Sequence, residues 1–301
     1  MDNKKFYNKK LEMVDIKVDK KNFEELGYII LKNFFNKKEI DDLSNKLWLI
    51  SYYYFYKIKS YRRFLNRLNS NKIDHLNKFS KFYDYFEKDE KKTLHSLQKI
   101  IEQNTEIKNF FFDKRLKKIY SSLLNIDYDL PVFLHGPNIF VNKPKTKRLL
   151  YKWHSEANFY PKRRGFLNIW FPLFNNKTKK NGTMKIKEKS HKNFDYPINE
   201  YIGYDKKSLN SQNNFWQKEI PEKFLRKYNT KIIDSKIGDL IIFHRNLVHS
   251  STLNNSKEFS FALTGRIWEF SKDYSLSSNF GMEENIYSTN ILNGHPEIED
   301  F

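Results

Sequence analysis

The spacing of apolar residues changes once along the chain, near Tyr128, and this change limits the folds that the chain can adopt. Before it, apolar residues recur every three or four positions, as in Ile40, Leu43 and Leu47, which is the spacing of an amphipathic helix. After it come short segments of aliphatic and aromatic residues separated by turn residues, which are typical of strands. Helices followed by many short strands predict an α+β fold.

The second half is expected to contain most of the strands. We predict strands at 131–134, 139–141, 153–156, 166–173 and 259–268, and further strands between 232 and 249. The segment 166–173 is almost continuously apolar, as expected of a strand that is buried on both faces. This many short strands predicts a jelly roll, a double-stranded β-helix, with an N-terminal helical region packed on it.

We expect a single domain over residues 21–272, with a helical part at 36–125 and the jelly roll at 128–272. Residues 1–20 are rich in lysine and are expected to form a loose leader, and residues 273–301 form a C-terminal tail rich in Ser and Asn. Residues 193–230 show no regular period. A segment this long inside a domain predicts a lid or binding loop.

Composition excludes several classes of protein. The chain has no cysteine, so it forms no disulfide and any metal must be bound by nitrogen and oxygen. No apolar run approaches the roughly 18 residues of a membrane span, and the N-terminus lacks the apolar core of a signal peptide. These features predict a cytoplasmic location.

The net charge of +19 does not by itself predict nucleic-acid binding. Lysines are scattered along the whole chain beside the Asn, Ile, Phe and Tyr that AT-rich codons encode, and no nucleic-acid-binding motif is present. The charge favours an anionic small-molecule substrate or an anionic membrane surface.

His154 and Glu156 are the first candidate metal ligands. Residues two apart on a strand point to the same face, so an imidazole and a carboxylate would emerge side by side. Downstream, His249 follows a strand and supplies a second imidazole. Two histidines and one carboxylate on one face of an ion form the facial triad of non-haem Fe(II) oxygenases.

Motifs around these residues, taken in order, resemble the phytanoyl-CoA dioxygenase family of Fe(II)- and 2-oxoglutarate-dependent oxygenases. The resemblance extends from Phe23 to Trp268. It is carried by Glu25–Leu31, Asn142-Lys143-Pro144, His154-Ser155-Glu156, Asn168–Leu173, Asn181–Met184, Ser190-His191-Lys192, Gly238-Asp239 and His249-Ser250-Ser251.

The resemblance implies a dioxygenase that uses Fe(II), 2-oxoglutarate and O2 to hydroxylate or otherwise oxidise a C–H bond. His154, Glu156 and His249 would be the catalytic metal ligands, with Glu in place of the family's usual Asp. Trp170 and Ser251 match positions that line the 2-oxoglutarate pocket.

One departure from the family concerns the residue that binds the distal carboxylate of 2-oxoglutarate. The family places an arginine eleven residues after the distal histidine, and this chain has Ser260 there. Another cation would have to bind the far carboxylate, and we rank Arg266 above Lys152 and Arg245. The departure keeps open an Fe(II) oxygenase that does not use 2-oxoglutarate. A second alternative, from a different class, is a non-catalytic jelly-roll binding module.

Overall fold

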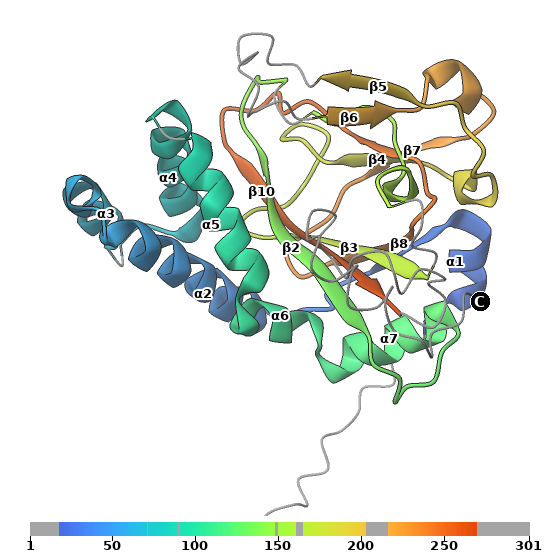
Figure 1. The fold of residues 1–301 in the computed structure, drawn as a ribbon, viewed down its shortest axis with the longest axis horizontal. Helices are drawn as coiled ribbons and strands as arrows, with labels where there is room; N and C mark the ends of the chain where they lie inside the picture. Colours follow the sequence, from blue (N-terminus) through green and yellow to red (C-terminus); the bar gives the residue numbers. More distant parts are fainter. Residues whose placement is uncertain are drawn as a thin grey trace, which may run out of the picture.

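Helices precede most of the strands in the computed structural model, which describes residues 18–70, 72–89, 91–147, 150–160, 165–202 and 216–269 (Figure 1). This confirms the predicted mixture of helices and antiparallel sheet. The helices are α1 (Lys20–Leu26), α2 (Lys37–Tyr56), α3 (Arg62–Leu68), α4 (His75–Asp89), α5 (Lys91–Gln103), α6 (Thr105–Phe111) and α7 (Lys114–Leu124).

The helix α2 begins where its sequence predicts. The side chain of Asn36 accepts a hydrogen bond from the Glu39 amide, and the Glu39 carboxylate accepts one from the Asn36 amide. This reciprocal capping box satisfies two amides that the first turn leaves unpaired. The periodic residues Ile40, Leu43 and Leu47 are all buried.

The strands form two larger antiparallel sheets and a hairpin. The five-stranded sheet has the order β1 (Tyr28–Leu31), β8 (Leu240–His244), β3 (Phe166–Pro172), β10 (Ser260–Trp268) and β2 (Phe133–Asn142). The three-stranded sheet has the order β7 (Thr230–Ile233), β4 (Met184–Lys187) and β9 (His249–Ser251). The hairpin pairs β5 (Asn199–Ile202) with β6 (Trp216–Glu219).

The helices cover one face of the five-stranded sheet, and the other face meets the smaller sheet (Figure 1). All residues of β3 are buried, as predicted for this segment. Ile169 and Phe171 pack in the core shared with the helices, whereas Trp170 packs in the core shared with β4 of the smaller sheet. The period of two along β3 therefore sends alternate side chains into two different cores.

Two predicted strands differ from the structure. The segments 131–134 and 139–141 belong to one strand, β2, whose pairing with β10 shifts register between Thr264 and Arg266. The expected strand at 153–156 is wrong, because His154 makes only a single bridge to His249 and Glu156 begins a short 3-10 turn. The Asn158 side chain accepts hydrogen bonds from the amide and hydroxyl of Ser155, and this closes the turn.

The segment 193–230 contains the hairpin and a 3-10 turn, Glu222–Leu225, although no period marks them in the sequence. Part of this expected lid, 203–215, lies outside the described residues. The same holds for residues 1–17 of the expected leader and for the expected tail at 273–301. Within the described part of the chain, no helix combines the length and the apolar character needed to cross a membrane.

Candidate active site

His154, Glu156 and His249 converge at one end of the space between the two larger sheets. Each offers one ligand atom, and the three atoms lie within 4.8 Å of one another. The Oε1 atom of Glu156 is 3.8 Å from Nε2 of His154 and 3.7 Å from Nε2 of His249. All three side chains are buried, so the group is separated from bulk water.

Backbone carbonyls fix the orientation of both imidazoles. Nδ1 of His154 lies 2.7 Å from the Lys152 carbonyl oxygen, and Nδ1 of His249 lies 3.0 Å from that of Leu247. A carbonyl oxygen only accepts, so each Nδ1 carries the proton and each Nε2 keeps its lone pair for a metal. Burial lowers the pKa of His249 to about 3, which keeps this imidazole neutral.

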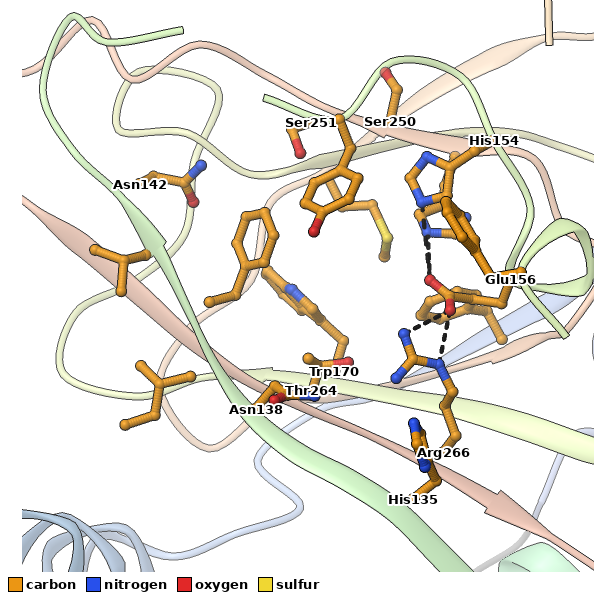
Figure 2. Close-up of a pocket in the computed structure, with 18 of the residues that line it drawn as sticks. His135, Asn138, Asn142, His154, Glu156, Trp170, Ser250, Ser251, Thr264 and Arg266 are labelled. Atoms are coloured by element: carbon orange, nitrogen blue, oxygen red, sulfur yellow. Dashed lines mark hydrogen bonds and ion pairs between the residues drawn. The ribbon is translucent and has the colours of Figure 1, made fainter. Parts of the chain in front are cut away.

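The second oxygen of Glu156 is bound to Arg266, on β10. Nε and Nη2 of Arg266 lie 2.7 Å and 2.5 Å from Oε2 of Glu156 (Figure 2). Burial alone would raise the pKa of Glu156, but Arg266 and His154 hold it well below the usual value. The carboxylate is therefore ionised, and its orientation leaves Oε1 facing the two imidazoles.

This donor set fits a single iron ion. Two neutral imidazoles and one carboxylate oxygen are the ligands of the facial triad, which leaves the remaining coordination positions open. The Nε2 atoms of both imidazoles face Oε1, and the carbonyl contacts at Nδ1 leave these atoms available to a metal. Among the described residues, no other group of three His, Cys, Asp or Glu side chains could hold a metal.

A cavity of about 620 Å³ opens from the triad and is lined by both larger sheets and by α5. In Figure 2, Glu156 and Arg266 lie at one side, Asn142 lies at the other, and Trp170 and Ser251 lie between them. Lining residues of α5 include Gln98, Lys99 and Glu102. The cavity is therefore large enough for a small metabolite beside a cosubstrate.

Comparison with protein families gives one match, to the model of phytanoyl-CoA dioxygenase over residues 23–260. The chain belongs to the phytanoyl-CoA dioxygenase family. This confirms the enzyme class predicted from the motifs, a non-haem iron oxygenase, and its cofactors, Fe(II) and 2-oxoglutarate with O2. No curated protein sequence matches the chain.

Solved structures show the same fold at low sequence identity. EctD from S. alaskensis, crystallised with 2-oxoglutarate and 5-hydroxyectoine, is 16% identical with a TM-score of 0.54, and the match covers 84% of this chain and 76% of EctD. The apo form of ThoJ, a non-haem monooxygenase, is 14% identical with a TM-score of 0.52, covering 83% and 76% of the two chains. At such identities the likeness shows the fold alone.

The structure brings most of the residues predicted for this phytanoyl-CoA dioxygenase family site together. His154, Glu156, His249, Trp170, Ser251 and Arg266 all line the cavity. Lys152 does not, because its ammonium group forms an ion pair with Glu219 at 2.6 Å. Arg245 does not line it either, and its guanidinium lies over the Phe166 ring.

Two residues escaped the sequence analysis. Asn142 belongs to the motif Asn142-Lys143-Pro144, which assigns its side chain no role, yet that side chain lines the cavity at the end away from Glu156. Lys177 follows turn residues in the sequence, but in the structure it forms a single bridge to Ser235, is fully buried and contacts both Asn142 and Ser260. Lys177 and Ser260 are separated by 83 positions, so no local pattern could have paired them.

Proposed function

We propose that this protein oxidises a C–H bond of a small anionic metabolite or conjugate in an Fe(II)- and 2-oxoglutarate-dependent reaction. The observation that carries the proposal is the triad of His154, Glu156 and His249, whose ligand atoms converge at the cavity. When bound, the iron would supply the oxidising power. The protein would hold it, orient both substrates and exclude water.

Both larger sheets serve this chemistry. We infer that they form the double-stranded β-helix that the sequence predicts, with the metal site between them. His249 and Ser251 come from β9 of the smaller sheet, whereas Trp170 and Arg266 come from β3 and β10 of the larger one. His249 on one sheet, and Arg266 on the other holding Glu156, would give the iron a rigid frame, which keeps the reacting atoms in a fixed geometry.

The charge of the cavity supports an anionic substrate. Lys99 on α5 and Lys218 on β6 both line it. Lys99 forms an ion pair with Glu102 at 3.0 Å, and Lys218 donates to the Asn158 carbonyl oxygen at 2.9 Å. The Lys99 charge is compensated by Glu102, which also lines the cavity, so the ammonium group of Lys218 would supply most of the attraction for a carboxylate or phosphate of the substrate. The structure of EctD with 5-hydroxyectoine, a small molecule, supports a metabolite of similar scale.

Family membership argues against both alternatives left open by the sequence. The model that matches residues 23–260 is that of a dioxygenase, which favours a catalytic protein that uses 2-oxoglutarate. The intact triad further disfavours the binding module, because such a module has no need of three converging metal ligands.

Metal binding and turnover test the proposal together. His154→Ala and His249→Ala should each abolish stoichiometric Fe(II) binding, measured by anaerobic calorimetry, because two ligands do not hold iron tightly. Circular dichroism should show both variants folded. The wild type should convert 2-oxoglutarate to succinate in an Fe(II)-dependent reaction, followed by NMR. Stoichiometric iron in both variants would refute the triad.

The substrate class needs a separate measurement. A panel of carboxylated, phosphorylated, neutral and cationic small molecules would be screened for stimulation of succinate formation. We expect stimulation from anionic members, because Lys99 and Lys218 face the cavity. Stimulation confined to cationic compounds would contradict the inferred substrate class and leave the enzyme class standing.

A further inference from the structure

Lys177 is a buried cation without a carboxylate partner. None of its side chain is exposed, and Nζ donates to Oδ1 of Asn142 at 2.6 Å and to Oγ of Ser260. In the described part of the chain, no Asp or Glu forms an ion pair with it. A buried ammonium that lacks an anion is costly, and burial lowers the pKa of Lys177 to about 7. Such a group suggests a bound anion.

The nearest route for an anion leads through Asn142. This residue lines the cavity, and its Oδ1 is occupied by Lys177. Its Nδ2 amide is then a donor, and no described group accepts a hydrogen bond from it. Because Lys177 polarises the amide, a carboxylate at this end of the cavity would meet a strengthened donor with a positive charge behind it.

Ser251 supplies a second donor at a suitable separation from the metal site. It lies two residues after His249 on β9, so its side chain is on the same face and roughly 7 Å further along the strand. Its hydroxyl donates to no described group, and it lines the cavity. This separation suits a short dicarboxylate with one end at the metal and the other at Asn142.

We propose that Lys177, acting through Asn142 and beside Ser251, holds the distal carboxylate of 2-oxoglutarate in place of an arginine at position 260. The inference rests on the proposed function and names the cation that the family pattern lacks. Arg266 is poorly placed for this task because its guanidinium binds Oε2 of Glu156, a metal ligand.

Ser260 and Lys177 form a matched pair. The Ser260 hydroxyl accepts from Lys177 and donates to the Asn181 carbonyl oxygen at 2.8 Å. A larger, charged arginine at position 260 would occupy the space of the ammonium group and repel it. The groups that contact Lys177 from β2 and β10 are the neutral side chains of Asn142 and Ser260. The positive charge that the family carries at position 260 would here be supplied by Lys177, from the segment between β3 and β4.

Two 2-oxo acids separate this role from a structural one. Anaerobic calorimetry on the Fe(II)-loaded protein would compare 2-oxoglutarate with 2-oxopentanoate, which has the same chain length and lacks the distal carboxylate. Lys177→Met should weaken 2-oxoglutarate by at least about 30-fold, the scale of losing a hydrogen-bonded charge partner. The affinity for 2-oxopentanoate should be unchanged, because that ligand cannot use the cation.

Two further variants support the comparison. Lys187→Met removes another buried lysine, on β4 and outside the cavity lining, and should leave both affinities unaltered. Asn142→Asp gives Lys177 a carboxylate partner, so it keeps the fold even if Lys177→Met does not. It places a negative charge where the cosubstrate carboxylate would lie and should abolish selectivity for 2-oxoglutarate over 2-oxopentanoate.

The outcomes separate this inference from the proposed function. The role of Lys177 would be overturned if Lys177→Met lost affinity equally for both 2-oxo acids, or if Asn142→Asp still preferred 2-oxoglutarate to 2-oxopentanoate. Either result would leave the proposed oxygenase function unchanged. A wild type that binds Fe(II) but neither 2-oxo acid would overturn both. Selective loss of 2-oxoglutarate in both variants would establish the anchor.

Discussion

Arg266 has a different neighbour from the one that its sequence position suggested. The sequence predicts it as the anchor of 2-oxoglutarate, whereas the structure places its guanidinium on Oε2 of Glu156, and Oε1 faces the imidazoles. Partners that orient a metal ligand typically contribute 10- to 100-fold to metal affinity. We therefore propose that Arg266 positions Glu156.

Arg266→Gln should weaken Fe(II) binding by about 10- to 100-fold when measured without 2-oxoglutarate, by competition with a chelator. Arg266→Lys should fall between that variant and the wild type, because an ammonium keeps the charge but not the planar fork. If Arg266 instead anchors the cosubstrate, iron affinity will be unaltered in both variants and only 2-oxoglutarate affinity will fall.

The buried ammonium of Lys177 predicts a pH dependence of stability. Its pKa is about 7 in the folded protein, below the ordinary lysine value of 10.5. Between these values the unfolded chain binds a proton that the native protein does not, so stability rises with pH, by at most about 1.4 kcal/mol per unit. Below pH 7 both states are protonated and the contribution is constant.

Urea unfolding of the apo protein at pH 6, 7, 8 and 9 would measure this effect as the difference between wild type and Lys177→Met, which cancels the other lysines. The wild type should gain stability relative to the variant from pH 7 upward. A difference that stays constant over the whole range would show that Lys177 has an ordinary pKa and that its burial is not costly.

At the scale of elements, the hairpin of β5 and β6 braces the loop that carries two metal ligands. The Ile220 amide donates to the Trp153 carbonyl oxygen at 2.6 Å, and Glu219 forms the ion pair with Lys152. Lys218 reaches the cavity from the same strand. These contacts connect part of the segment 193–230, predicted as a lid, directly to the site.

Ligand binding is therefore expected to reduce the flexibility of this hairpin. Hydrogen–deuterium exchange of the amides of β6 and of Ile220 should slow when Fe(II) and 2-oxoglutarate are added together, because the loop they brace becomes anchored by the metal. Amides of β3, in the centre of the sheet, serve as the internal control. Unchanged exchange in β6 with saturated ligand would argue against a lid.

Along the whole chain, the spacing of apolar residues predicted which segments form helices and which form strands, and the order of the motifs predicted the metal ligands. The spacing of apolar residues predicted α2 and β3 correctly, because α2 buries one face and β3 buries both, and each pattern is local in the sequence. The strand expected at 153–156 failed because one side-chain cap, from Asn158 to Ser155, turns the backbone there. The pairing of Lys177 with Ser260 was beyond sequence reasoning, since only tertiary packing joins them.

The helices share one core with the five-stranded sheet, which supports the expected single domain. Phe171 of β3 lies with its ring centroid 5.1 Å from that of Phe35 and 5.6 Å from that of Phe110. Its neighbour in sequence, Trp170, points to the opposite face and lines the cavity. Strand β3 therefore packs against the helices on one face and lines the cavity on the other.

Phe171→Ala should destabilise the protein by about 3 to 5 kcal/mol, the cost of a large buried aromatic and the cavity that its loss leaves. Phe194→Ala is the matched control, because 74% of that side chain is exposed and its loss should change stability by less than about 0.5 kcal/mol. Urea unfolding would be followed by far-ultraviolet circular dichroism, which reports the helices, and by tryptophan fluorescence, which includes Trp170. In Phe171→Ala the midpoints of both unfolding curves should shift together to a lower urea concentration, because the helices and the sheet unfold as one cooperative unit. Two separate transitions, with only the helical signal shifted, would show that the helical region is a domain of its own and that the site does not depend on it.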